Sequence, residues 1–289
     1  MYPPNVISRI VLILALGGLL AGCGSGGSTG RTSVVAAFYP LAFAAERIGG
    51  SDYNLENLTP PGAEPHDLEL TPREVGRIVN ADVVLYLSHG FQPAVSKALG
   101  QAHGTKVDVL AGLPLHASAG GEEGLTADPH VWLDPILFAR VARRIRAALH
   151  RPSAGLVGEL RTLDSEYRDG LRRCKRHEIV TSHAAFGYLA ARYGLRQISI
   201  TGLTPESEPS ARQLAHVVQI VRRTHATTVF FETLVSPRLA ETVAREVGAR
   251  TAVLDPIEGL TPSEQKSGET YLTVMRKNLA ALQRALGCR

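Results

Sequence analysis

The feature that most constrains the fold of this chain is an alternation of strand-like and helix-like segments, which occurs in two series along the sequence. Short apolar, β-rich runs followed by amphipathic helical patterns are typical of parallel α/β sheets. The first series predicts strands at residues 34–38, 53–58, 82–87 and 106–110, with helices at 41–48, 72–80 and 92–99. The second predicts strands at 178–181, 197–200, 228–231 and 251–254, with helices at 185–193, 210–223, 237–247 and 269–286.

The two series are separated by residues 134–173, where no strand pattern occurs and apolar residues recur at helical spacing. Pro152 interrupts this pattern, so we predict a helix of the first lobe followed by a second, connecting helix. The predicted fold class is α/β, with two lobes of parallel sheet at residues 34–150 and 175–289, joined by a long connecting helix at 151–174. A ligand site between the lobes is expected in such a protein.

Composition places the chain among ordinary globular proteins and argues against some partners. Of its 289 residues 44% are hydrophobic, which is enough to bury substantial cores. The formal charge of +4 comes from 31 Lys and Arg against 27 Asp and Glu, without a long run of one sign. We therefore expect no nucleic-acid partner. Three cysteines without a CxxC spacing are too few for a disulfide scaffold.

The amino-terminal segment has the pattern of an export signal. Residues 1–22 contain one charge, Arg9, followed by an apolar run at 10–20 that is too short to span a bilayer comfortably. The sequence LAGC ending at Cys23 resembles the lipobox of bacterial lipoproteins, which implies that Cys23 is lipidated and becomes the first mature residue. The alternative is a plain signal peptide with an incidental cysteine. Residues 23–33 would then form a flexible tether, and the protein would lie outside the cytoplasm, anchored to the cell membrane.

Four positions combine metal-ligand chemistry with a suggestive place in the predicted fold. His183 and Asp255 each follow a predicted strand of the second lobe, and ligands of open α/β sheets bind beyond the carboxyl ends of strands. His66 and His130 lie in proline-containing segments of the first lobe and would meet them across the crevice. Three imidazoles and one carboxylate suit a tetrahedral zinc ion. Each histidine alone is more commonly a capping or solvated residue, so spacing does not by itself establish the site.

Five ordered segments of the chain carry a family resemblance. They are PGAEPHDLELTP, DPHVWLDP, VTSHAAFGYLA, FFETLVSP and VLDPIEG. In this order and separation they resemble the metal-specific solute-binding proteins of bacterial ABC importers, the ZnuA/TroA-like group. The resemblance covers roughly the whole mature chain and implies two α/β lobes joined by one long helix, with the metal between them.

Carried over segment by segment, the resemblance places the metal ligands at His66, His130, His183 and Asp255. It implies a binding protein without enzymatic activity, with Zn²⁺ as the transported ligand and an importer permease with its ATPase as partners. We expect a monomer. Glu232 follows a predicted strand and could orient a ligand histidine as a hydrogen-bond acceptor.

Departures from the family pattern bear on the metal. Zinc members often have a long His-rich loop before DPHVW, but the Gly-rich segment 111–128 contains only His116 among histidines. His183 occupies a position where manganese and iron members tend to have Glu, which favours zinc. Glu64, two residues before His66, is interpreted as a solvated loop acid because four ligands already complete a tetrahedral shell.

Three other functions remain open at this point. A manganese or iron binder of the same family would differ in metal content after competitive loading. A zinc-dependent hydrolase would need an open coordination position and a general base, and no HExxH segment is present. A surface adhesin with a structural metal would leave no mark in the sequence that we can name.

A disulfide between Cys174 and Cys288 is also expected. Cys174 precedes the first strand of the second lobe, and the final helix must run antiparallel to the last strand, which carries Cys288 to the same end. An oxidising compartment would allow the two to pair, away from the metal. The alternative is two free thiols.

Overall fold

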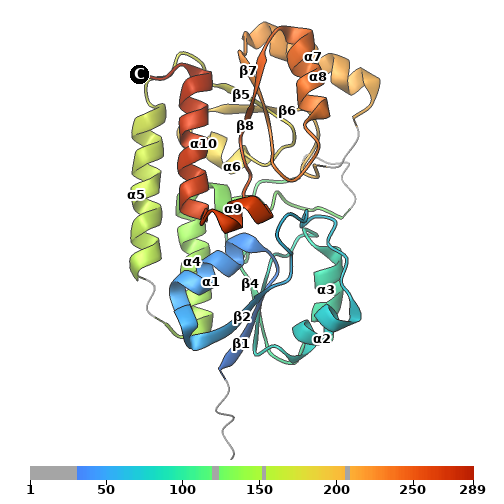
Figure 1. The fold of residues 1–289 in the computed structure, drawn as a ribbon, viewed down its shortest axis with the longest axis vertical. Helices are drawn as coiled ribbons and strands as arrows, with labels where there is room; N and C mark the ends of the chain where they lie inside the picture. Colours follow the sequence, from blue (N-terminus) through green and yellow to red (C-terminus); the bar gives the residue numbers. More distant parts are fainter. Residues whose placement is uncertain (1–30, 119–123, 152–153, 206–208) are drawn as a thin grey trace, which may run out of the picture. The chain divides into compact units, whose positions relative to one another are not determined.

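The computed structural model describes residues 31–118, 124–151, 154–205 and 209–289, which form two four-stranded parallel sheets with helices around them (Figure 1). The first part of the chain contains β1 (Thr32–Ala36), α1 (Tyr39–Gly49), η1 (Gly50–Asp52), β2 (Tyr53–Asn57), α2 (Pro72–Asn80), β3 (Val83–Tyr86), α3 (Pro93–Leu99), β4 (Thr105–Asp108), η2 (Val131–Leu133) and α4 (Pro135–Leu149). The second contains α5 (Ala154–Leu171), β5 (Glu178–Thr181), α6 (Gly187–Tyr193), β6 (Arg196–Ser199), α7 (Ala211–Thr224), β7 (Thr228–Phe231), α8 (Arg238–Val247), β8 (Arg250–Val253), α9 (Pro262–Lys266) and α10 (Tyr271–Leu286).

The predicted α/β class with two parallel sheets is confirmed, and the differences lie at element ends. β1 begins at Thr32, so the last two residues of the expected 23–33 tether belong to the first strand. The short helix α9 was not expected. The signal at 1–22 and the lipidation site Cys23 lie outside the described residues. None of the helices in the described part of the chain has the length and apolar character needed to span a membrane.

Both sheets have the same topology, in the orders β2-β1-β3-β4 and β6-β5-β7-β8. In the first sheet Val34 of β1 lies between Leu55 of β2 and Val83 of β3. The central strands are rich in buried apolar residues because helices cover both faces of a parallel sheet. The chain reverses direction across the sheet between β1 and β3, and again between β5 and β7. The carboxyl ends of these strand pairs are the positions where α/β proteins bind ligands.

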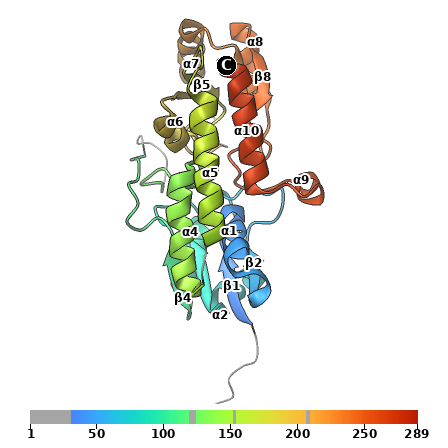
Figure 2. The same ribbon diagram turned by 90° about the vertical axis from the view of Figure 1, so that its left-hand side faces the viewer.

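Helices α4 and α5 form the strandless stretch that the sequence predicted. The side chain of Asp134 accepts hydrogen bonds from the backbone N–H groups of Ile136 and Leu137, which fixes the start of α4. The helix ends where His150 adopts a left-handed conformation with φ 53°. Helix α5 packs against both α4 and α10 (Figure 2). The predicted boundaries at 150/151 and 174/175 stay predictions.

The last helix, α10, contacts residues of both halves. At its start the backbone N–H of Tyr271 donates to the hydroxyl of Tyr39 at 3.0 Å, and its own hydroxyl donates to the carbonyl of Trp132 at 2.5 Å. The Tyr271 ring also stacks on Phe43 with 5.5 Å between ring centroids. At the other end, a disulfide joins Cys288 to Cys174. The helix is therefore fixed to the first half at its start and to the second half at its end.

Candidate metal centre

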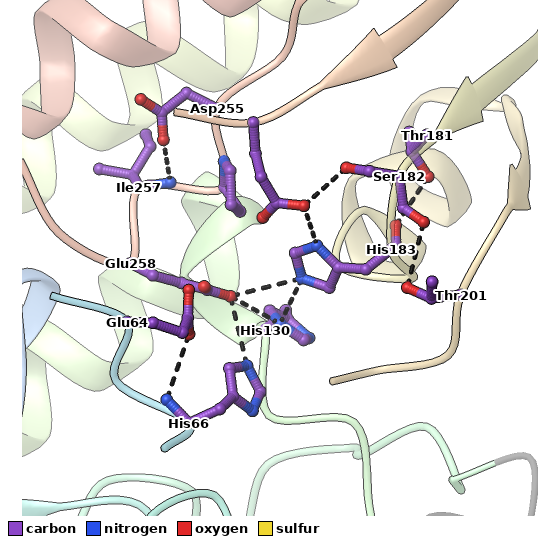
Figure 3. A network of polar contacts seen from close by, with 12 residues as sticks. Glu64, His66, His130, Thr181, Ser182, His183, Thr201, Asp255, Ile257 and Glu258 are labelled. Carbon is purple, nitrogen blue, oxygen red and sulfur yellow. Dashed lines mark hydrogen bonds and ion pairs between the residues drawn. The ribbon is translucent and has the colours of Figure 1, made fainter. Parts of the chain in front are cut away.

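Four buried side chains converge where the two halves meet: His66, His130, His183 and Glu258 (Figure 3). Each offers one donor atom, and the four atoms lie within 4.8 Å of one another. The Glu258 Oε1 atom is 3.0 Å from His130 Nε2, 3.4 Å from His66 Nε2 and 3.5 Å from His183 Nε2. At most 7% of any of these four residues is exposed. Three ring nitrogens and one carboxylate oxygen thus point at a common centre that is shielded from solvent.

Two carboxylates orient two of the imidazole rings from behind. The Nδ1 atom of His130 lies 2.8 Å from Asp128 Oδ1, and that of His183 lies 2.8 Å from Glu232 Oε1. The Ser182 hydroxyl donates to the same Glu232 oxygen at 2.6 Å. A carboxylate next to Nδ1 places the proton there and leaves the Nε2 lone pair free for a metal. The structure therefore places Glu232 where the sequence suggested, as a partner of a candidate ligand.

The pKa shifts in the group arise because four ionisable side chains are buried close together. Burial lowers the pKa of His66. Burial also opposes protonation of His130 and His183, but hydrogen bonds and charges of neighbouring carboxylates outweigh it and raise the pKa of both rings. The three imidazoles hold the pKa of Glu258 well below its usual value despite its burial. The carboxylates thus favour the protonated forms of His130 and His183, and the imidazoles favour the ionised form of Glu258.

Buried oxygen atoms in the group lack a hydrogen-bond partner. Within the described residues, Glu258 Oε2 and Glu232 Oε2 are both inaccessible to solvent and unpaired. A buried polar atom without a partner is costly, and such atoms gather where a ligand or ion completes the site.

The structure does not bring Asp255 into this group, contrary to the sequence-based expectation. The Asp255 side chain is buried, but its carboxylate accepts hydrogen bonds from the backbone N–H of Ile257 and the hydroxyl of Thr233 (Figure 3). Burial raises the pKa of Asp255 to about 7. Glu258 supplies the carboxylate instead. It lies three residues after Asp255, on the turn that follows β8, and its side chain is the one that points at the histidines.

Sequence reasoning missed two residues of the group, although both lie in the quoted segments. Glu258 is the second acid of VLDPIEG, three residues beyond Asp255, the acid that directly follows the predicted strand. Asp128 is the first residue of DPHVWLDP, two positions before His130. An acid close to a predicted ligand histidine is the signal that could have indicated its role.

The residues with doubtful roles in the sequence lie beside the group. Glu64 accepts a hydrogen bond from the backbone N–H of His66 at 3.2 Å and is not one of the four convergent donors. His116, in the described part of segment 111–128, stacks on Tyr188 with 4.1 Å between ring centroids. The Tyr188 hydroxyl donates to the carbonyl of Asp128 at 2.8 Å. This segment is therefore tied to the loop that carries His130.

Two parallel α/β halves that together enclose a set of three imidazoles and one carboxylate define a two-lobed α/β binding protein. Residues 34–285 match the protein family described as ZnuA, zinc-uptake complex component A, periplasmic. The chain belongs to this family, as the resemblance of its five segments predicted.

Individual relatives agree with the family assignment. The high-affinity zinc uptake system protein ZnuA of Bacillus subtilis (strain 168) is 34% identical over 306 aligned residues, covering 97% of this chain and 96% of the relative. The zinc-binding lipoprotein AdcA of Streptococcus pneumoniae (strain ATCC BAA-255 / R6) is 36% identical over 278 residues, and the match spans 88% of this chain but only 56% of AdcA. The crystal structure of the Zn(II)-bound ZnuA-like domain of S. pneumoniae AdcA superposes with a TM-score of 0.76 at 34% identity, covering 89% of this chain and 99% of that domain.

Proposed function

We propose that this protein is an extracytoplasmic zinc-binding protein that captures Zn²⁺ with His66, His130, His183 and Glu258 and delivers it to an ABC permease. The observation that carries the proposal is the spacing of the four donor atoms. Zn–N distances of about 2.0 to 2.1 Å in a tetrahedron separate neighbouring ligand atoms by roughly 3.3 Å. In the structure, four of the six separations are 3.0, 3.4 and 3.5 Å to Glu258 and 3.4 Å between the Nε2 atoms of His130 and His183, and the other two are within 4.8 Å.

The donor set supports zinc more strongly than manganese or ferrous iron. Three neutral imidazoles and one carboxylate oxygen match the ligands that zinc prefers, and zinc exceeds manganese in intrinsic affinity for them. Manganese favours harder, oxygen-rich shells of higher coordination number. A buried group with a single converging carboxylate offers few such oxygens.

The same donor set argues against a zinc-dependent hydrolase. Catalytic zinc sites keep one position open for water, with three protein ligands around the ion. Here four donors converge, which completes a tetrahedral shell. The family resemblance to solute-binding proteins points the same way, so we propose binding and release without a chemical step.

Capture is proposed to occur between the halves, because each half supplies two of the four donors. His66 and His130 come from the first half, and His183 and Glu258 come from the second. The two halves are also joined beside the site, where the Gly62 N–H donates to the Leu260 carbonyl at 2.9 Å. Loss of this contact would separate His66 from Glu258 and open the shell. Since α10 is fixed to both halves, we expect this opening to be a small loop shift rather than a wide hinge motion.

Location and partners complete the proposal. The lipobox-like sequence at Cys23 supports a lipid anchor that holds the protein at the outer surface of the cell membrane, next to its permease and the associated ATPase. We propose that the protein acts as a monomer. In a detergent-phase partitioning assay, the wild type should be found in the detergent phase and the Cys23→Ser variant in the aqueous phase. Equal partitioning of both proteins would contradict the anchor.

Elemental analysis and zinc titration test the function. We expect the purified protein to bind one zinc ion per chain and to prefer zinc to manganese in competition. Glu258→Ala should lose most of this affinity, whereas Asp169→Ala, which removes an exposed carboxylate on α5, should retain it. Absence of stoichiometric zinc binding by the wild type would refute the proposal.

A further inference from the structure

The turn that carries Glu258 into the site has an unfavourable backbone conformation. Ile257, directly before Glu258, has φ 57°, in the left-handed region that β-branched residues rarely adopt. Such a conformation is unfavourable for a β-branched residue and persists only where surrounding contacts enforce it. Both residues are fully buried, so their side chains cannot relax into solvent.

Asp255 supplies the contacts that enforce this turn from within. Its Oδ1 atom accepts a hydrogen bond from the Ile257 N–H at 2.7 Å, so the carboxylate fixes the peptide unit that enters the strained residue. Its Oδ2 atom accepts a hydrogen bond from the Thr233 hydroxyl at 3.1 Å. Thr233 is the neighbour of Glu232, which orients the ring of His183. Both carboxylate oxygens are therefore engaged within the second half.

Residues from two other elements hold the same turn from outside. Asn278, buried on α10, forms a pair of hydrogen bonds with the backbone of Asp255: it accepts from the N–H at 2.9 Å and donates to the carbonyl at 2.6 Å. The Trp132 indole N–H donates to the Pro256 carbonyl at 2.7 Å. Trp132 is two residues beyond His130. The residues that contact the turn are therefore neighbours of the site, since Thr233 follows Glu232 and Trp132 lies two residues after His130, or belong to α10, as Asn278 does.

We propose that Asp255 is a positioning residue of the metal site, which holds Ile257 in its strained conformation and so presents the Glu258 carboxylate to the three histidines. The inference rests on the proposed zinc-binding function. The role of Asp255 is to accept two hydrogen bonds, and negative charge is not required for it. A turn formed before metal arrives avoids the cost of ordering Glu258 on binding, which increases affinity.

Two substitutions at Asp255 separate this role from ligation. Asp255→Ala removes both accepted hydrogen bonds and should weaken zinc binding about 10- to 100-fold, the effect typical of losing a residue that supports a ligand. Asp255→Asn keeps an oxygen for the Ile257 N–H and an amide that can donate to Thr233, so it should retain affinity close to that of the wild type. Glu258→Gln, the matched change at a ligand, should lose affinity strongly. Zinc competition titration on the full chain measures all three.

A spectroscopic measurement distinguishes positioning from general loss of structure. Cobalt(II) bound to the wild type and to Asp255→Asn should give the same visible absorption, because the same four donors hold it. In Asp255→Ala the absorption should weaken and shift as Glu258 is replaced by water. Thr233→Val, nearly the same in shape, removes only the Oδ2 contact and should weaken zinc binding a few-fold. This variant keeps the inference testable if Asp255→Ala does not fold.

The outcomes are distinguishable from failure of the proposed function. If the wild type binds no zinc, the function itself is wrong. If the wild type binds zinc and Asp255→Asn loses it as severely as Glu258→Gln, Asp255 acts through its charge and the inference is overturned. Unchanged affinity and unchanged cobalt absorption in both Asp255→Ala and Thr233→Val would also overturn it.

Discussion

The two sheets have the same strand order, yet the residues of the candidate metal centre lie at different positions relative to the strand ends in the two halves. In the second half, Glu232 directly follows β7 and His183 lies two residues after β5, at the point where the strand order reverses. In the first half, His66 lies nine residues after β2, and His130 lies in the long connection between β4 and α4. The second sheet therefore positions His183 and its partner Glu232 through strand ends, whereas His66 and His130 lie on loops and Glu258 lies on the turn after β8.

The two histidines on loops of the first half are held by contacts with side chains distant in sequence. His66 packs edge-on against Phe91 with 4.7 Å between ring centroids. His130 is held by the carboxylate of Asp128, and the backbone carbonyl of Asp128 in turn accepts a hydrogen bond from Tyr188 of the second half. Donors on loops are thus placed by contacts between distant parts of the chain.

The largest expected effect is the loss of one donor. His66→Ala and His183→Ala should each weaken zinc binding by about 100- to 1000-fold, since structural zinc sites gain about 10 to 16 kcal/mol from four ligands and each tenfold corresponds to about 1.4 kcal/mol. Calorimetric titration measures both. Unchanged affinity in both variants would remove the assignment, and a much smaller effect at His66 would indicate that the first half is replaceable.

Asp128 and Glu232, the carboxylates that contact the Nδ1 atoms of His130 and His183, allow a matched comparison of the two halves. Asp128→Asn and Glu232→Gln should each weaken zinc binding by about 10- to 100-fold, because each removes the carboxylate that fixes a histidine ring. The loss should be greater for Asp128, since the loop that bears His130 has no strand end to position it. Chelator competition on both variants gives the order. A greater loss in Glu232→Gln would reverse the comparison.

We expect the preference for zinc over manganese to depend on a donor of the second half. His183→Glu adds a carboxylate, makes the site harder and should narrow the ratio of zinc to manganese affinity, although zinc can still bind more tightly. Competition titration of both metals at one pH is the measurement. The same substitution at His66 provides the control from the first half. An unchanged ratio in His183→Glu would mean that His183 does not determine selectivity.

Acidity should affect the three candidate ligand histidines unequally. In the metal-free protein the pKa values of His130 and His183 are raised and that of His66 is lowered, so zinc should compete with protons mainly at His130 and His183, one in each half. Affinity should therefore begin to fall above the ordinary imidazole value of about 6.5 as the pH decreases, by up to tenfold per pH unit for each proton displaced. Calorimetry in buffers of different ionisation enthalpy should detect proton release at pH 7. Identical heats in all buffers would contradict it.

The smallest effect on the metal site is expected from the disulfide. Replacing Cys174 and Cys288 by Ser should lower the free energy of unfolding by about 2 to 4 kcal/mol, because the bond closes a long loop in the unfolded chain. Zinc affinity should stay unchanged, since the bond lies at the far end of α10 from Tyr271. Denaturant unfolding and zinc titration of the double variant measure the two quantities. A large loss of affinity would show that the site depends on the far end of α10.

Much of the fold followed from local pattern. Runs such as VVLY of β3 and TVFF of β7 are mainly apolar because both faces of a parallel sheet are buried, and this property is visible in the sequence. The helical start at Pro135 follows from the capping side chain of Asp134 beside it. The attachment of α10 to both halves, through Tyr271 at its start and the disulfide at its end, depends on contacts between residues distant in the sequence. Such contacts produce no local pattern in the sequence from which they could be predicted.

For the candidate metal centre, the three histidines and a supporting role for Glu232 could be predicted from the sequence, because each belongs to a motif or follows a strand. The choice between Asp255 and Glu258 could be made only from the assembled fold. The two acids are three residues apart in one buried turn, and their roles depend on the left-handed conformation of Ile257. That conformation is enforced by partners remote in sequence, Asn278 and Trp132, whose proximity to the turn arises only when both halves and α10 are assembled. Local propensity acts over a few residues, so it cannot specify a backbone conformation that long-range contacts impose.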